Sequence, residues 1–164
     1  MMAQTTAAGG KLQKILDAWF DAWNANDLDR VMTFFADNVV YRPGDGSEHR
    51  GKAAVRRAFE PQFKGALGTM RFDEIDRLID EVSRKVATRW ICRHDASGFR
   101  SHSASQWLKR IAVGLTVGNR FGWEGLDVLH FDEAGKVIGK FSYGSYRRHP
   151  LLLKQLGVPL PARV

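Results

Sequence analysis

The sequence has little of what marks secreted, membrane or disulfide-bonded proteins. One cysteine among 164 residues, Cys92, excludes an internal disulfide. No apolar run approaches the roughly 18 residues of a membrane-spanning helix. The first residues, "MMAQTTAAGGKLQ", lack both the basic and the apolar segment of a secretory signal. These absences predict a cytoplasmic protein that does not enter membranes, with a disordered N-terminal arm over residues 1–10.

Clustered charge and clustered metal ligands are also missing. The net charge of +7 would suit nucleic acid, but the 25 Lys and Arg residues occur mainly singly or in pairs. No basic stripe alternates with aromatic residues. No pair of His, Cys or acidic residues has the spacing of metal ligands. We therefore expect no nucleic-acid partner, no metal and no cofactor.

Aromatic side chains are abundant, with ten Phe, five Trp and three Tyr. Hydrophobic residues make up 44% of the chain, enough for a substantial core. Small-molecule sites are mostly apolar with a few polar groups, so part of this aromatic supply suits a pocket. Ordinary core packing explains any single aromatic residue equally well.

Helical periodicity comes first along the chain, and strand-like alternation follows. Asp27 is a good N-cap for the second helix. The pattern predicts an α+β fold, in which the N-terminal helices pack on one face of a strongly curved antiparallel sheet, as one domain over residues 11–164. Such a sheet leaves a cone-shaped cavity. The predicted helices cover residues 12–23, 28–35 and 53–63, and the predicted β segments cover 38–42, 70–80, 84–94, 101–119, 123–131 and 137–143.

Asp127 is the most informative residue. In "WEGLDVLHF" the alternation places Asp127 on the same face as Trp123 and Leu129. A buried charge is costly unless it is paired, hydrogen-bonded or neutralised. We predict that Asp127 is a catalytic acid/base. The alternative is a structural carboxylate, paired with an arginine or hydrogen-bonded to a Trp indole.

The strand over residues 84–94 supplies a second candidate. Trp90, Cys92 and His94 share one of its faces. His94 is a candidate acid/base partner of Asp127, and the alternative is a structural histidine near a strand end. Cys92 has no activating neighbour in the sequence and is expected to be an inert core thiol.

Aromatic and polar residues on the inner faces are candidates for binding a substrate. Arg42 could hold an anionic group of a ligand, or it could be a surface charge paired with Glu48 or Asp127. Strand alternation allows only one of Tyr41 and Arg42 to point inward. The second arm of the hairpin is expected to place Tyr143 on an inner face with Phe141. The predicted substrate-binding residues are Trp19, Trp23, Tyr41, Arg42, Phe59, Trp90, Trp107, Trp123 and Tyr143.

Three stretches resemble the SnoaL-like, or nuclear transport factor 2-like, superfamily. They are "AWNANDLDRVMTFFADNVVYRPG", "RGKAAVRRAF" and "LTVGNRFGWEGLDVLHFDEAGKVIGKF". The resemblance covers about residues 15–146. It implies a cone-shaped α+β barrel with a deep apolar pocket, often in a homodimer. Members include polyketide cyclases, steroid isomerases, dehydratases, epoxide hydrolases and non-enzymatic transport or scaffold proteins, so fold alone does not give function.

The family's functional residues carry over only in part. The steroid isomerases have a Tyr where this chain has Trp19 and a proton-abstracting Asp where it has Arg42, but their second Asp aligns with Asp127. The epoxide hydrolases have an Arg at the position of Gly125. Asp127 resembles the single acid/base of the SnoaL-type polyketide cyclases.

The resemblance thus implies a cofactor-independent isomerase, cyclase or dehydratase (a lyase). Its substrate would be a hydrophobic, cyclic or aromatic carbonyl compound. The alternative is a non-catalytic ligand-binding or dimeric scaffold module of the same fold.

Overall fold

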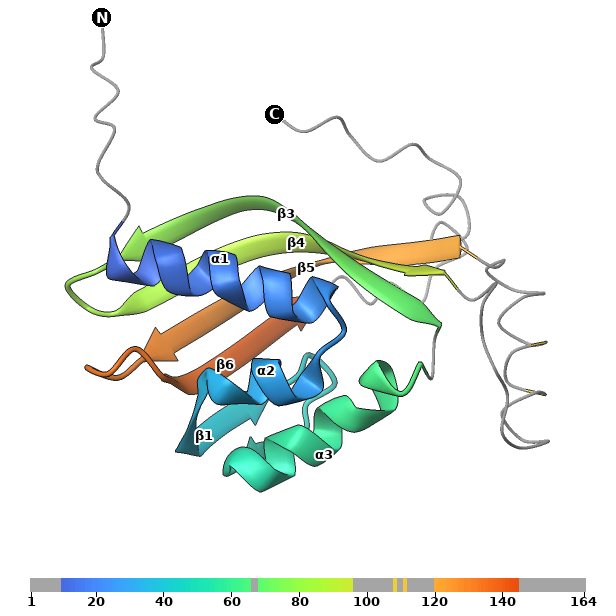
Figure 1. Cartoon of the computed structure of the whole chain (residues 1–164), viewed down its shortest axis with the longest axis horizontal. Helices are drawn as coiled ribbons and strands as arrows, with labels where there is room; N and C mark the ends of the chain where they lie inside the picture. Colours follow the sequence, from blue (N-terminus) through green and yellow to red (C-terminus); the bar gives the residue numbers. More distant parts are fainter. Residues whose placement is uncertain (1–9, 66–67, 96–107, 109–110, 112–119, 145–164) are drawn as a thin grey trace, which may run out of the picture.

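The computed structural model describes residues 10–65, 68–95, 108, 111 and 120–144 (Figure 1). Within them, no helix has both the length and the hydropathy needed to cross a membrane. The helices are α1 (Lys11–Asn24), α2 (Leu28–Thr33) and α3 (Lys52–Phe63). The strands are β1 (Phe35–Arg42), β2 (His49–Arg50), β3 (Thr69–Asp80), β4 (Lys85–Asp95), β5 (Arg120–Phe131) and β6 (Val137–Gly144).

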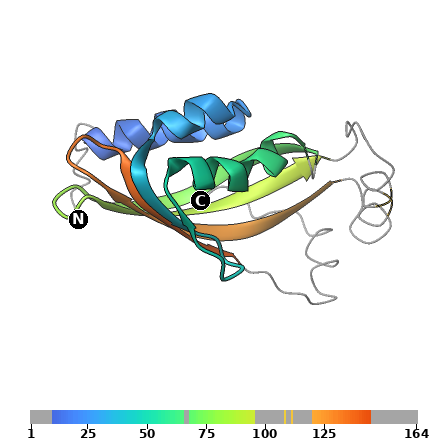
Figure 2. The same cartoon turned by 90° about the horizontal axis from the view of Figure 1, so that it is seen from below.

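The six strands form one curved sheet in the order β2-β1-β6-β5-β4-β3. Figure 2 shows the three helices on the same side of this sheet. The predicted α+β architecture is confirmed. One pairing departs from the expected antiparallel pattern, because β1 and β6 run parallel. Parallel neighbours need a long connection, and here α3 and four strands intervene between β1 and β6.

Several predictions fall wholly or mostly on residues that the structure does not describe. Residues 1–9 of the predicted N-terminal arm lie outside the described residues, as do Trp107 and most of the stretch 101–119. Leu108 and Ile111 are the two described residues of that stretch. Both are helical, so the predicted β segment is wrong at these positions.

Polar side chains fix the end of α1 against the sheet. The side chain of Asn24 bonds to both backbone groups of Phe72 on β3: its Nδ2 donates to the carbonyl oxygen at 3.0 Å, and its Oδ1 accepts from the backbone N–H at 2.7 Å. Asp27 caps α2 as predicted, accepting from the backbone N–H of Arg30 at 2.9 Å. The "NAND" segment therefore both interrupts the helices and anchors α1. The buried apolar face of α1 consists of Leu12, Leu16, Trp19, Ala22 and Trp23.

The β5–β6 hairpin holds the main departure from the sequence analysis. β5 alternates as predicted, with Asp127, Leu129 and Phe131 all buried. On β6, however, the register shifts at Ile138, since His130 pairs with Gly139 while Phe131 pairs with Val137.

This extra residue is a β-bulge, and it exchanges the faces of the strand. Lys140 and Ser142 consequently line the inner side, with Ser142 directly opposite Asp127. The prediction that Tyr143 is on an inner face is wrong, because Tyr143 is 59% exposed.

Close packing between β4 and β5 requires a glycine at position 125. Trp90 pairs with Gly125 across the two strands, and its indole ring lies over the glycine. A Cβ atom at this position would come within 2.8 Å of Trp90 Cζ3 and closer still to two further ring atoms. The absence of a side chain at Gly125 thus leaves room for the indole ring of Trp90.

We predict that Gly125→Ala lowers the free energy of unfolding by about 1–3 kcal/mol, because the new methyl group overpacks the site. Urea unfolding of the variant and the parent measures the difference. Trp90→Leu removes the clashing ring atoms, so the cost of Gly125→Ala should shrink in that background. An equal cost in both backgrounds would contradict this account of the contact.

Candidate functional site

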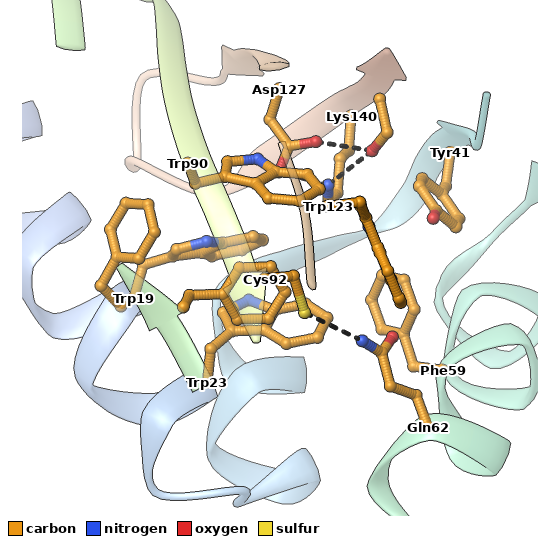
Figure 3. Close-up of a pocket in the computed structure, with 13 residues that line it drawn as sticks. Trp19, Trp23, Tyr41, Phe59, Gln62, Trp90, Cys92, Trp123, Asp127 and Lys140 are labelled. Atoms are coloured by element: carbon orange, nitrogen blue, oxygen red, sulfur yellow. Dashed lines mark hydrogen bonds and ion pairs between the residues drawn. The ribbon is translucent and has the colours of Figure 1, made fainter. Parts of the chain in front are cut away.

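A cavity of about 80 Å³ lies between the helices and the inner face of the sheet (Figure 3). Aromatic side chains from α1, α3 and the strands form most of its lining. Figure 3 shows Asp127 and Lys140 at one end, with Trp23 and Gln62 toward the other. The lining residues are Trp19, Phe20, Trp23, Tyr41, Phe59, Gln62, Phe72, Trp90, Cys92, Trp123, Asp127, Lys140 and Ser142.

Three polar side chains form a closed cluster at one end of this cavity. Lys140 Nζ lies 2.6 Å from Asp127 Oδ2. The same ammonium donates to Ser142 Oγ at 2.8 Å, and the Ser142 hydroxyl donates to Asp127 Oδ1 at 2.6 Å. Asp127 and Lys140 are each only 5% exposed. The cluster is therefore a buried ion pair bridged by a hydroxyl group.

Burial and the ion pair act on Lys140 in opposite directions. Burial lowers the pKa of the Lys140 ammonium, and the Asp127 carboxylate beside it offsets only part of that effect. The ring of Tyr41 faces the ammonium, with Nζ 5.4 Å from the ring centroid, which is within cation–π range. Lys140 is thus a cation that loses its proton more readily than an exposed lysine does.

The structure brings most of the predicted site residues together. Seven of them line the cavity and come from elements far apart in the sequence. Strand alternation is confirmed at β1, where Tyr41 lines the cavity and Arg42 does not. The seven are Trp19, Trp23, Tyr41, Phe59, Trp90, Trp123 and Asp127.

Arg42 and Tyr143 lie elsewhere. The Arg42 side chain is exposed, forms an ion pair with Glu48 and lies near the ring of Phe141. Neighbouring residues on a strand point to opposite faces, so Arg42 points outward because Tyr41 points inward. Tyr143 follows the bulge outward, and Trp107 is not among the described residues.

His94 is buried but does not line the cavity. Its ring stacks on Trp123, with ring centroids 4.6 Å apart, and on Phe121 at 5.2 Å. His94 Nε2 lies 3.2 Å from Cys92 Sγ. These contacts place His94 beside the aromatic lining, near the end of β4.

Cys92 contacts the cavity but is not activated. Burial, with a smaller contribution from Asp127, raises the pKa of the Cys92 thiol to about 12. Gln62 Nε2 approaches the sulfur at 4.0 Å. The thiol is therefore protonated at neutral pH, in agreement with the expectation of an inert core thiol.

Lys140 and Ser142 were not predicted as site residues from the sequence. In "VIGKFSYG" a regular alternation that starts at Val137 puts both residues on the outer face, and an outward lysine is unremarkable. Only the bulge at Ile138 turns them inward. Nothing in the local residue pattern marks that bulge, so the cation beside Asp127 is found only in the folded chain.

Two buried donors in the lining have no acceptor among the described residues. They are the indole N–H groups of Trp23 and Trp90. Buried donors in proteins are almost always hydrogen-bonded, to protein or to another molecule. Among the described residues, no group of three or more His, Cys, Asp or Glu side chains is arranged to hold a metal ion.

The SnoaL-like domain family matches residues 16–139, more than half of the chain. The chain belongs to the SnoaL-like family. The resemblance deduced from the three sequence stretches is thereby confirmed. The match includes Asp127 but ends one residue before Lys140.

Solved structures similar to this SnoaL-like chain agree with the fold. SalBIII, an epoxide hydrolase/cyclase-like enzyme in pyran ring formation in the polyether salinomycin, has a TM-score of 0.63 at 15% identity, covering 83% of this chain and 92% of that one. RV0760c from Mycobacterium tuberculosis, in complex with estradiol-17beta-hemisuccinate, has a TM-score of 0.57 at 16% identity, covering 78% and 88%.

An NTF2-like protein of unknown function from Exiguobacterium sp. 255-15 has a TM-score of 0.58 at 19% identity, covering 80% of this chain and 98% of that one. At these identities the likeness establishes the fold alone. No curated protein matches the sequence.

The buried pair predicts that removing one charge destabilises the protein more than removing both charges. Lys140→Met leaves the Asp127 carboxylate buried without its cation, and we expect a loss of about 3–5 kcal/mol in the free energy of unfolding. The double variant Asp127→Leu/Lys140→Met removes both charges, and it should recover most of that loss. Urea unfolding measures both changes.

Lys64 provides a matched control, because its side chain is 75% exposed and pairs with Glu60 on the surface of α3. Lys64→Met should change the free energy of unfolding by less than about 1 kcal/mol. If Lys140→Met is as mild as Lys64→Met, the ion pair is not buried in solution and the account of the site is wrong.

Proposed function

We propose that this SnoaL-like protein binds a hydrophobic, cyclic or aromatic carbonyl compound and moves a proton at the carbon next to the carbonyl group. Asp127 is the acid/base of this reaction, and Lys140 supplies positive charge beside it. No cofactor takes part. Such chemistry would make the protein an isomerase, a cyclase or a lyase that removes water. The observation that carries the proposal is the buried Asp127–Lys140 pair at one end of an aromatic cavity.

The environment of Asp127 suits proton transfer. Its carboxylate is held by two donors at 2.6 Å, so its orientation toward the cavity is fixed. A general base must be positioned within hydrogen-bond reach of the proton that it removes. Removing a proton beside a carbonyl group leaves negative charge on the carbonyl oxygen. A cation in a water-poor site stabilises such charge strongly.

The cavity lining suits a ligand that carries oxygen atoms. The N–H groups of Trp23 and Trp90 are buried without an acceptor among the described residues. A ligand oxygen would satisfy either donor, while the aromatic rings around it contact the apolar body of the ligand. This combination favours an oxygenated ring compound over a plain hydrocarbon.

Two of the neighbours with the same fold are connected with cyclic compounds. SalBIII acts in pyran ring formation, and RV0760c is in complex with a steroid ester. The role of the first and the ligand of the second support a cyclic ligand for this chain.

The size of the cavity bears on the ligand. A volume of about 80 Å³ is below the roughly 300–1,000 Å³ of drug-sized ligand pockets. It is also about half of the ~150 Å³ apolar cavity that accepts benzene. A ring compound therefore enters only if lining side chains move aside. Six lining residues are only partly buried: Phe20, Tyr41, Gln62, Phe72, Trp123 and Ser142.

The alternative function is a non-catalytic ligand-binding or dimeric scaffold module in the cytoplasm. The outer face of the sheet favours it. Leu78, Ala87, Val128 and Phe141 pair in one row across four strands, and Leu78 is 77% exposed. Exposed apolar residues gathered on a sheet face are typical of an interaction surface. A homodimer formed through this face would cover that row.

The proposed reaction is tested by exchange of ketone protons for deuterium. Cyclohexanone and 2-tetralone in D₂O exchange the hydrogens beside their carbonyl group, and NMR follows the loss of signal. We expect the protein to accelerate the exchange of at least one ketone, and Asp127→Asn to reduce that acceleration by about 10²–10⁴-fold. Quenching of the fluorescence of the lining Trp residues reports binding in the same samples.

Asp76→Asn is the matched control, because Asp76 pairs with Arg89 and its side chain is 63% exposed. This variant should keep the full exchange rate. Binding without accelerated exchange would contradict the proposed reaction and support the ligand-binding alternative. With neither binding nor exchange, the scaffold alternative remains, and sedimentation equilibrium then decides whether the chain is a dimer.

A further inference from the structure

Lys140 differs from the other lysines of the described chain. It is the lysine that belongs to the buried class there, and it lines the cavity. Its side chain reaches this position only because the bulge at Ile138 turns β6 over. Lys64, the C-cap residue of α3, has by contrast a side chain that is 75% exposed.

The fold does not need a cation at this position. A lysine that enters an apolar interior loses its hydration, and a buried ion pair is weak support for stability compared with packed apolar residues. Lys140 and Asp127 together take space among Tyr41, Trp90 and Trp123 that apolar side chains would fill. Such a lysine is typical of sites that use a free amine as a nucleophile, since burial favours the neutral form.

The contacts around Lys140 provide routes for its proton. Nζ is 2.6 Å from Asp127 Oδ2, so one proton can pass directly to the carboxylate. Nζ also donates to Ser142 Oγ at 2.8 Å, and Ser142 donates to Asp127 Oδ1 at 2.6 Å. The hydroxyl group thus forms a second route between the same two residues. Burial lowers the pKa of Lys140, which also favours transfer of its proton to Asp127.

We propose that Lys140 is a nucleophilic catalytic residue that joins the carbonyl carbon of an aldehyde or ketone as an imine, with Asp127 and Ser142 moving the protons. This inference rests on the proposed function, because it takes the carbonyl compound of that proposal as the partner of Lys140. It narrows the substrate class to aldehydes and ketones, since esters and amides do not form imines in this way.

The reaction balances with the groups present. Lys140 gives one proton to Asp127, and its nitrogen lone pair then forms a bond to the carbonyl carbon while the C=O π electrons move to oxygen. Asp127 protonates that oxygen and takes a proton from nitrogen, which gives a carbinolamine. Asp127 then returns a proton to the hydroxyl group, the C–O bond breaks, and water leaves. The products are a protonated imine on Lys140, an Asp127 carboxylate and one water molecule.

The imine also explains how the pair would serve the proposed proton transfer. A protonated imine carries its positive charge on the substrate and draws electrons from the neighbouring carbon. The Asp127 carboxylate, regenerated beside it, can remove a proton from that carbon to give an enamine. The two residues would therefore act in sequence, first to bind the substrate covalently and then to activate it.

Reductive trapping tests the imine. The intact protein is incubated with cyclohexanone and sodium cyanoborohydride, which reduces an imine to a stable secondary amine. We expect one cyclohexyl group per chain in intact-mass spectra, mapped to Lys140 by peptide analysis. The labelling of Lys140 should be at least about tenfold faster than that of exposed Lys64, because burial and Asp127 activate the amine.

Three variants control the experiment. Lys140→Arg keeps a cation but cannot form an imine, and it should lose the fast label. Lys64→Arg should keep it, and Asp127→Asn should slow it. The position of the label is mapped in the parent protein, so the test of Lys140 does not depend on whether a variant folds. Labels spread equally over the exposed lysines, or no label on Lys140, would overturn the proposal.

The two proposals fail in different ways. Ketone exchange that depends on Asp127 but gives no trapped Lys140 overturns the imine and leaves the proposed function intact. A trapped Lys140 without ketone exchange supports the imine and contradicts the proposed proton transfer. Absence of both signals overturns both proposals.

Discussion

The buried ion pair between Asp127 and Lys140 is the interaction on which the site depends. Two opposite charges, each 5% exposed, are held 2.6 Å apart inside a mainly aromatic cavity. Neither charge is tolerable there without the other, because an uncompensated buried charge is strongly destabilising. The positions of both residues are therefore coupled. The strand β6 must carry its bulge at Ile138, and Ser142 must face Asp127, for the pair to form at all.

The rest of the fold positions and encloses this pair. α1 contributes Trp19 and Trp23 to the lining, and its end is tied to β3 by the side chain of Asn24. The indole ring of Trp90 packs against Gly125 and lines the same cavity as the pair. The aromatic lining surrounds the two charges with apolar surface. In such surroundings a fixed charge acts on a reacting group more strongly than it does in water, and both proposals use this effect.

Much of the fold could be predicted from the sequence, because local patterns control it. The alternation in β4 and β5 predicted the inward faces of both strands, including the burial of Asp127, and helical spacing predicted the buried face of α1. What could not be predicted depends on single irregularities and on distant contacts. The bulge at Ile138 shifts the phase of β6 by one residue, which moved Lys140 inward and Tyr143 outward. The parallel pairing of β1 with β6 joins segments nearly a hundred residues apart.

The titration of Lys140 tests the central claim most directly. NMR of the Nζ and Cε nuclei, with Lys140→Arg to assign the signals, measures the pKa of this one ammonium in the intact protein. The account predicts a pKa below the ordinary lysine value of about 10.4, because burial outweighs the attraction of Asp127. A pKa at or above the ordinary value would contradict it. Lys140 would then be a solvated or firmly protonated cation, and the site would lack the free amine on which the proposed imine depends.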